Sequence, residues 1–478
     1  MAKTLVVAEK PSVGKDIARV LGCRERGEGC LIGETYIVTW AIGHLVSLCE
    51  PDELDEQYKR WSYQTLPILP QTIPLKVLSA TKGQYNIVAG LMNGPETDGV
   101  ICATDAGREG ELIFRYIYEK CGCRKPITRL WISSMTDEAI QEGFQHIRPG
   151  ADYDGLYRSA VCRSQADWLV GMNATRAFTL RYDTLLSVGR VQTPTLAILV
   201  KRHQEIATFK PEGFCTLTAS FVDYEGQWFR EGLDPDTHIP HKAQAQAIAA
   251  QVQGQTGRVL SAETTRKREP PPQLYDLTSL QRDANRLLGY TAQQTLDYAQ
   301  SLYEKKLASY PRTDSRYLTS HMENSTKTLV ASITNLLSFT GNMSVPCNVA
   351  QMSVPCNVAQ VIDNSKVTDH HALIPTAGIA GYDLLSLPAG ERSLLTLLMV
   401  RLLCAVGKPC RIHETAVTLE CEGVSFFLKG RQIMDMGWKS MEKVCRTALK
   451  SAPVEETAAQ ELPPLNDQMT FLPVKTSI

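Results

Sequence analysis

The chain has 478 residues, a length that predicts two to four domains of about 100–200 residues rather than one hydrophobic core. Hydrophobic residues make up 43% of the chain and charged residues 21%, which excludes a disordered, collagen-like or disulfide-scaffold protein. The net charge of −1 argues against indiscriminate coating of nucleic acid and permits a local basic groove.

The sequence predicts a cytoplasmic protein without membrane attachment. Its most apolar stretch, 393–406, contains Arg401 and is shorter than the ~20 residues that span a bilayer. The first ten residues hold too short an apolar run for a secretory signal. The fourteen cysteines form no C-x-x-C pair, so reduced thiols are expected and no zinc ribbon is predicted.

Residues 1–150 predict an α/β domain with a mainly parallel sheet. Four apolar runs rich in β-branched residues favour buried strands: 4–8, 36–40, 99–103 and 128–132. Helical patterns follow them, beginning at Pro11, at Arg108 and at Thr136. Alternation of strands and helices is typical of a parallel sheet.

The next segment is basic and helical in pattern. Residues 156–202 contain seven Lys or Arg and two Asp, a net charge of +5 that suits a surface facing phosphates. Alternating runs at 213–260 then favour β structure, and Glu269–Pro272 marks a stiff junction.

Helical patterns return at 273–335 and 390–406, and the alternating run 416–428 suggests that the β domain resumes. Between them, nine residues at 343–351 are repeated without change at 352–360, which we interpret as a duplicated loop insertion. The polar tail is expected to be flexible.

Three acidic residues are candidates for a metal site. Glu9 follows the first strand and Asp105 the strand 99–103, and carboxyl ends of parallel strands meet at one edge. Glu109 lies in the first turn of the next helix. Carboxylates are ligands that Mg²⁺ accepts, although acids at helix starts also simply answer the helix dipole.

Tyr310 precedes a cation, a hydroxyl and a carboxylate in Tyr310-Pro311-Arg312-Thr313-Asp314. A phenol can act as a covalent nucleophile when a neighbouring cation stabilises the charge that develops. Asp369-His370-His371 offers imidazoles beside a carboxylate, suited to a phosphate contact or proton transfer; a plain surface turn is the alternative. Gly14-Lys15 lacks the remaining residues of a phosphate loop, so no nucleotide cofactor is predicted.

Together these motifs resemble the type IA DNA topoisomerases, and among them the topoisomerase III branch. The matching segments occur in the family's order along residues 1–440: Glu9–Ser12, Gly43–Leu45, Asp105–Glu111, Asp167–Gly171, Ser187–Pro194, Tyr310–Ser315 and Asp369–Ala372.

The resemblance implies a multidomain fold of α/β and α+β parts. The implied domains are a Toprim metal-binding domain (1–150), a helical domain that holds single-stranded DNA (151–206), a β-rich arch in two parts (207–268 and 409–440), a helical domain with Tyr310 (269–408) and a tail (441–478).

The resemblance also implies roles for individual residues. Tyr310 would be the nucleophile with Arg312 beside it, Glu9 would assist proton transfer at the leaving 3′ oxygen, Lys10 would lie near phosphate, and His370 would contact the scissile region. Glu9, Asp105 and Glu109 would hold Mg²⁺. The strand groove would be lined by Arg163, Asp167, Ser187, Arg190 and Gln192.

Two departures from the family matter. Gly107 stands where many members have a second Asp, so metal is expected to bind more weakly. The family's strand-holding domain is usually completed after the arch, whereas this sequence ends about forty residues past Trp438. We therefore expect apolar surface to stay exposed at Trp168, Leu169 and Val170, and supercoiled plasmid to be relaxed poorly.

The expected activity is cleavage of one DNA strand through a 5′-phosphotyrosyl intermediate, strand passage and rejoining without ATP. The substrate would be single-stranded or negatively supercoiled DNA, and a RecQ-type helicase is a partner that the resemblance suggests. Two rivals stay open: a module that only binds or cleaves single strands, and a Toprim nuclease or primase that needs no Tyr310.

Overall fold

The structure is a computed structural model that describes residues 2–132, 135–221, 224–230, 236–339, 357–367, 370–448, 470–471 and 474–477. The chain folds into two compact units, each assembled from three stretches of sequence. Unit 1 consists of Met1–Thr208, Leu296–Ser315 and Ser365–Tyr382. Unit 2 consists of Phe209–Thr295, Arg316–Asn364 and Asp383–Ile478.

Unit 1 contains a seven-stranded sheet with a parallel centre. Its strands, in spatial order, are β2 (Glu25–Gly27), β3 (Cys30–Ile32), β4 (Tyr36–Trp40), β1 (Lys3–Ala8), β7 (Thr97–Ala103), β8 (Ile127–Arg129) and β9 (Arg148–Pro149). Strands β4, β1, β7 and β8 run parallel, and the outer strands are antiparallel. The predicted parallel α/β fold is confirmed.

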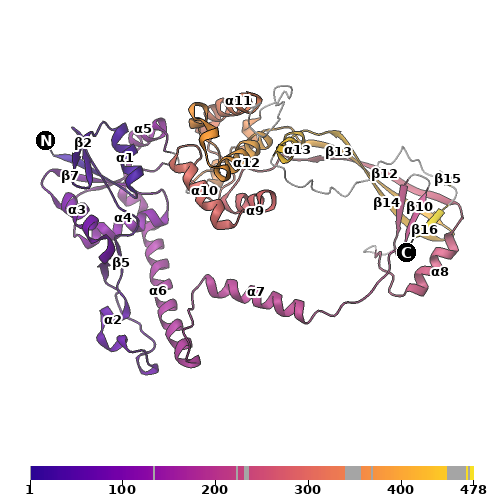
Figure 1. Ribbon diagram of the computed structural model, residues 1–478, viewed down its shortest axis with the longest axis horizontal. Coiled ribbons are helices and arrows are strands. Elements are labelled where there is room, and N and C mark those ends of the chain that lie inside the picture. Colours follow the sequence, from indigo (N-terminus) through magenta and orange to yellow (C-terminus); the bar gives the residue numbers. More distant parts are fainter. Residues whose placement is uncertain are drawn as a thin grey trace. The chain divides into compact units, whose positions relative to one another are not determined.

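Helices cover both faces of this sheet. They are α1 (Pro11–Val20), α3 (Lys82–Asn93), α4 (Arg108–Lys120), α5 (Asp137–Gln145) and α6 (Asp154–Tyr182). Because side chains alternate along a strand, Val6 and Ala8 face α1 and α5, whereas Leu5 and Val7 face α3, α4 and α6 (Figure 1). Burial of each of the Val and Leu side chains contributes about 1.5–3 kcal/mol.

The strand expected at 128–132 is shorter than predicted. β8 ends at Arg129, although Leu130 N–H still donates to the carbonyl of Cys102 at 3.0 Å. Trp131 leaves the ladder and stacks on Tyr153, with ring centroids 5.1 Å apart. An aromatic contact outside the sheet therefore ends this strand.

Helix α6 packs against the rest of unit 1 along the part that contains Trp168 and Asn173. The indole N–H of Trp168 donates to the carbonyl of Cys49 at 2.8 Å, and Asn173 bonds to both backbone groups of Ile68. Trp168 is only 7% exposed, so the expectation of an exposed Trp168 is wrong. The sequence gives no sign of its partner, which lies 119 residues earlier. Leu169 is partly buried, and Val170 is exposed as expected.

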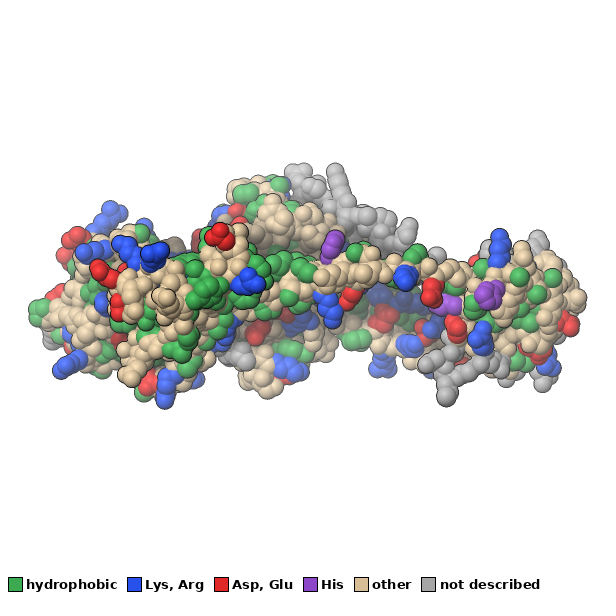
Figure 2. Space-filling view, turned by 90° about the horizontal axis from the view of Figure 1, so that it is seen from below, with side chains coloured by type: hydrophobic (Ala, Val, Ile, Leu, Met, Phe, Trp, Pro, Cys, Tyr) green, Lys and Arg blue, Asp and Glu red, His purple; other side chains and the backbone are tan. Residues whose placement is uncertain are grey.

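Beyond this packed part of α6, hydrophobic side chains lie on the surface over the C-terminal end of α6 and along α7 (Gln192–Ala207) (Figure 2). None of the residues of α7 is buried. The large exposed side chains on α7 are Leu196, Ile198, Leu199, Val200 and Ile206.

Unit 2 contains a seven-stranded antiparallel sheet. Its strands, in spatial order, are β15 (Thr470–Phe471), β12 (Gly257–Glu269), β13 (Cys410–Cys421), β14 (Val424–Asp435), β11 (Tyr224–Trp228), β10 (Thr218–Phe221) and β16 (Val474–Ser477). The run 416–428, predicted as one alternating stretch, is a hairpin that turns at Glu422-Gly423, both with positive φ. Such a two-residue turn matches the twist of the strands.

The helices of unit 2 include two that the sequence did not predict: one at residues 242–252, and one at residues 439–448, most of which belongs to the tail expected to be flexible. The helices of this unit are α8 (Lys242–Val252), α9 (Leu277–Leu288), α11 (Glu323–Phe339), α12 (Ala389–Ala405) and α13 (Lys439–Ala448). α8 interrupts a region predicted as β structure, and its run of Ala and Gln explains why, since both are strong helix formers. Ala245, Ala249 and Val252 pack against the sheet.

The remaining elements connect these parts. They are α2 (Pro51–Leu54), the pair β5 (Val46–Leu48) and β6 (Leu75–Val77), and α10 (Ala292–Glu304), which begins in unit 2 and ends in unit 1. The predicted domain boundaries stay predictions, and unit 1 includes two stretches from the expected helical domain 269–408. Residues 340–356 of the duplicated loop and 449–469 of the tail lie outside the described residues.

Across the part of the chain that the structure describes, no helix combines the length and apolarity that a membrane crossing requires.

Candidate active site and strand-binding surface

The first part of the site is a pair of carboxylates at the ends of neighbouring parallel strands. Glu9 follows β1 and Asp105 lies two residues after β7. The backbone N–H of Asp105 donates to Glu9 Oε2 at 3.1 Å. Burial, and secondly the charge of Asp105, raise the pKa of Glu9 to about 7. The two acids therefore form one crowded, partly buried pair.

Tyr310 lies beside this pair, within unit 1. Its ring packs edge-on against Tyr303, with centroids 5.4 Å apart, and lies 4.3 Å from the ring of His370. Tyr310 and Asp105 line the same small cavity, and burial, followed by the charges of Asp105 and Glu9, raises the phenol pKa. The structure thus brings together four predicted site residues.

Hydroxyl groups hold the Tyr310 segment in place. In Ser309–Ser315 the hydroxyls of Ser309, Thr313 and Ser315 donate to the carbonyls of Ala372, His370 and Lys366, at 3.1, 3.0 and 2.8 Å. These bonds fix the side of the segment that faces residues 366–372. Arg312 is exposed, while Tyr310 packs against the core. The spacing of Ser and Thr along the motif fixes where the phenol lies.

A small cavity of about 10 Å³ lies at the phenol. It is lined by Val13, Ala103, Thr104, Asp105, Ala106, Ile132, Met135, Tyr303, Tyr310 and His370. That volume matches roughly one water molecule. The cavity is therefore too small to admit a nucleotide, and the site is closed to DNA in the described structure.

His370 is 4% exposed and bonds to the backbone of Ala106. Burial, and secondly His371, lower its pKa to about 3, so the imidazole is neutral near pH 7. In this arrangement it can donate or accept a hydrogen bond but carries no positive charge. The preceding Asp369 lies outside the described residues.

The two predicted cations lie at the edge of the site. Arg312 is exposed, and its charge lowers the pKa of Tyr310 against the effect of burial. Lys10 Nζ lies 4.0 Å from Glu304, and its charge lowers the pKa of Glu9. Both are placed to meet an anionic group.

Glu109 does not join the other two acids in a cluster. It accepts a hydrogen bond from His44 Nε2 at 2.8 Å, which raises the pKa of His44 and lowers that of Glu109. Among the described residues no group of three His, Cys, Asp or Glu is arranged to hold a metal. Sequence reasoning missed His44 as a site residue, although it lies within the Gly43–Leu45 match.

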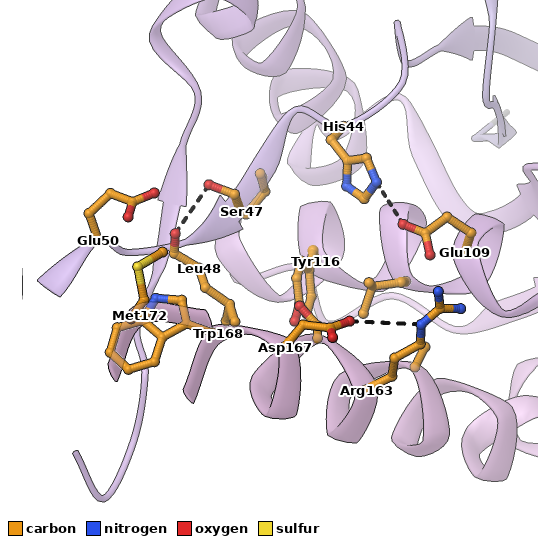
Figure 3. A pocket seen from close by; sticks show the side chains of 14 residues that line it. His44, Ser47, Leu48, Glu50, Glu109, Tyr116, Arg163, Asp167, Trp168 and Met172 are labelled. Atoms are coloured by element: carbon orange, nitrogen blue, oxygen red, sulfur yellow. Dashed lines mark hydrogen bonds and ion pairs between the residues drawn. The ribbon is translucent and has the colours of Figure 1, made fainter. Parts of the chain in front are cut away.

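Next to Glu109 opens a cavity of about 470 Å³ between α6 and the chain after β4 (Figure 3). His44 and Glu109 line one part of it, and Trp168 and Met172 another. Arg163 and Asp167 lie between them, with Arg163 Nε 3.9 Å from Asp167 Oδ2.

Asp167 also pairs with Arg190, whose Nε lies 2.5 Å from Asp167 Oδ1, and this hydrogen bond lowers the pKa of Asp167. Three of the five predicted groove residues are thus together. Ser187 and Gln192 are exposed and do not line the cavity.

The fold and this site define a class of protein, and comparison with known families agrees. A family described as DNA topoisomerase matches residues 151–476, and the Toprim domain matches residues 4–135. Because the first match alone covers more than half of the chain, the chain belongs to the DNA topoisomerase family. The predicted family resemblance is confirmed.

Among individual relatives, two Bacillus proteins named DNA topoisomerase 3 are similar to this chain. DNA topoisomerase 3 of Bacillus subtilis is 41% identical over 444 residues, covering 92% of this chain and 60% of the relative. DNA topoisomerase 3 of Bacillus thuringiensis is 39% identical, covering 99% and 64%. The chain therefore spans less than two thirds of the length of these relatives.

Among solved structures, full-length topoisomerase I from Thermotoga maritima superposes with a TM-score of 0.70. The match covers 99% of this chain and 71% of that one, at 19% identity. At that identity the similarity shows the fold alone.

Proposed function

We propose that the chain carries the cleavage and rejoining chemistry of a type IA DNA topoisomerase. It cleaves one strand of single-stranded or negatively supercoiled DNA, permits strand passage and rejoins the ends without ATP. The observation that carries the proposal is the meeting of Tyr310 and Asp105 at one small cavity, with Glu9 accepting a hydrogen bond from the Asp105 backbone. A RecQ-type helicase is the partner proposed from the family.

The reaction exchanges one phosphoester bond for another. The Tyr310 oxygen attacks the phosphorus of a backbone phosphodiester, and the bond to the 3′ oxygen breaks as the bond to Tyr310 forms. The phenol proton leaves toward Asp105, whose charge acts on the phenol, and Glu9 supplies a proton to the 3′ oxygen. Arg312 and Lys10 stabilise the charge at phosphorus, and neutral His370 orients the phosphate by a hydrogen bond.

We propose Mg²⁺ as the cofactor. Burial, and secondly the charge of Asp105, raise the pKa of Glu9, and a cation at the two carboxylates would offset both effects, so Glu9 and Asp105 fit a hard divalent ion. With Gly107 in place of a third carboxylate, Glu109 would complete the set by releasing His44. The ion, when bound, supplies positive charge that helps to align DNA ends.

The large cavity and its basic rim are the proposed path of the strand. Arg163 and Arg190 would meet phosphates once Asp167 gives up one of them, with Ser187 and Gln192 adding exposed hydrogen-bonding groups. Trp168 and Met172 supply apolar contact inside the cavity. A nuclease or primase would use Glu9 and Asp105 but has no need of a partly buried Tyr310 at the same cavity as Asp105.

The decisive test uses a single-stranded oligonucleotide labelled at its 3′ end, incubated with the protein and analysed by denaturing electrophoresis. The label should migrate with the protein, because the phosphotyrosyl bond retains the 3′ fragment. Tyr310→Phe should abolish the adduct and leave oligonucleotide affinity nearly unchanged. Tyr63→Phe, at an exposed tyrosine away from the site, is the matched control. Free 5′-phosphate products without an adduct would support the nuclease instead.

A further inference from the structure

Directly behind the carboxylate pair lies a fully buried arginine, Arg129, at the end of β8. Its Nη1 donates to the carbonyls of Cys102, Thr104 and Leu130 at 3.0, 2.8 and 3.0 Å. Its Nη2 donates to the carbonyl of Asp105 at 2.7 Å. Two of these four carbonyls belong to the loop that carries Asp105.

Peptide planarity transmits these bonds to the site. In a trans peptide the C=O and N–H point in opposite directions. Because Arg129 holds the carbonyl of Thr104, the N–H of the same peptide, that of Asp105, points the other way, toward Glu9 Oε2. The next peptide is fixed in the same manner by the bond to the Asp105 carbonyl. The guanidinium therefore sets the direction of the N–H that Glu9 accepts.

The charge of Arg129 is balanced within the same unit. Glu111, 1% exposed, lies 3.1 Å from Arg129 Nε through its Oε2, and its Oε1 accepts from Arg115 at 2.9 Å. Arg115 in turn bonds to Asp154 on α6. A buried ion is costly unless paired, so Glu111 is what permits Arg129 to remain charged behind the site.

Close packing from α4 completes the clamp. The hydroxyl of Thr104 donates to the carbonyl of Gly110 at 2.8 Å. A Cβ added to Gly110 would lie 2.1 Å from the Asp105 carbonyl oxygen, so only glycine allows α4 to approach the loop this closely. The loop is thus held from the strand side by Arg129 and from the helix side by Gly110.

We propose that Arg129, neutralised by Glu111, is a positioning residue for the cleavage reaction: it fixes the Thr104–Asp105–Ala106 backbone and so places Asp105 and Glu9 relative to Tyr310. The inference rests on the proposed function for the chemistry, but the orientation of the loop can be measured without activity. Arg129 itself does not line the cavity at Tyr310.

The test compares Arg129→Lys with Arg115→Met. Lysine keeps the charge but lacks the planar fork that reaches carbonyls on two sides, so the adduct should form about 10- to 100-fold more slowly, as expected when reacting groups are misplaced by about 1 Å. Oligonucleotide affinity should change less than twofold. Arg115→Met removes the other partner of Glu111 and touches no carbonyl of the loop, so it should leave the adduct rate unchanged even if thermal stability falls.

Two further measurements separate positioning from folding. Backbone hydrogen exchange of the peptide covering residues 103–108 should be faster in Arg129→Lys than in the wild type and unchanged in Arg115→Met, whether or not the protein is active. Millimolar guanidinium should restore adduct formation to Arg129→Ala, whereas methylammonium should not.

Unchanged exchange at 103–108 in Arg129→Lys would overturn the inference, and so would an unchanged adduct rate. An absent adduct in the wild type would instead refute the proposed function, with the exchange result still deciding whether Arg129 holds the loop.

Discussion

The two functional regions of unit 1 are built in opposite ways. Around Tyr310 the polar groups are buried and bonded, from the serine and threonine hydroxyls that pin the nucleophile segment to the guanidinium behind Asp105. In the strand-binding surface Arg163, Asp167 and Arg190 are exposed, and no residue of α7 is buried. A reaction that breaks and forms bonds requires its groups to be held in a fixed geometry, whereas a surface that binds a flexible DNA strand tolerates mobile side chains.

This comparison predicts that substitutions near Tyr310 change rates and that substitutions on α6 change affinity. After the loss of Tyr310 itself, the largest effect is expected at Arg312, whose charge acts on the phenol. Arg312→Ala should slow single-turnover adduct formation about 10²-fold, as loss of one electrostatic donor does. Arg24→Ala, at an exposed arginine outside the site, serves as the control for a mere loss of charge. Equal rates for Arg312→Ala and the wild type would remove Arg312 from the chemistry.

Asp105→Asn and Glu109→Gln should differ, because the structure separates the two acids. Asp105 donates a backbone hydrogen bond to Glu9 and lines the cavity at Tyr310, and its loss should slow Mg²⁺-dependent rejoining at least about tenfold. Glu109 is exposed and paired with His44, so Glu109→Gln should raise the Mg²⁺ concentration needed and be corrected at saturating Mg²⁺. Rejoining of a preformed adduct, measured over a Mg²⁺ titration, distinguishes the two. Identical Mg²⁺ dependence in both variants would contradict the separation.

Arg163→Ala and Arg190→Ala should act on binding. Each removes one phosphate contact, so oligonucleotide affinity should fall several-fold and the slope of log K against log salt should decrease by about 0.7, the value for single strands. The adduct rate at saturating oligonucleotide should change little. Fluorescence anisotropy at several salt concentrations measures both quantities. A lower rate at saturation without loss of affinity would place these arginines in the chemistry instead.

The parts of this site that follow local pattern were predictable from sequence. Glu9 and Asp105 each follow a β-branched apolar run, so adjacent parallel strands bring them to one edge. Tyr310 was marked by its neighbours along the chain. Contacts between distant segments were not predictable: His44 meets Glu109 across 65 residues.

Arg129 illustrates the same limit. In the sequence, Arg129 is only one residue of the predicted strand 128–132. A buried charge is identified by the groups it pairs with, and the sequence does not show those groups. Likewise, Trp168 was expected to be exposed because its hydrogen-bond acceptor at Cys49 lies far away in sequence. The helix α8 was missed for a different reason, since its Ala-rich run was read within a longer β-like pattern.

The smallest effect is expected on the exposed face of α7. Leu199 is 63% exposed, so Leu199→Gln removes little buried area and should change the free energy of unfolding of this chain by no more than about 0.5 kcal/mol. Trp168→Phe is the contrasting variant: it removes the indole donor to the Cys49 carbonyl inside the core, which should cost about 1–3 kcal/mol. Urea unfolding of both variants measures the difference. If Leu199→Gln were the more destabilising, α7 would have a packing partner in solution, and the contrast between a fixed centre and an exposed helix would not hold.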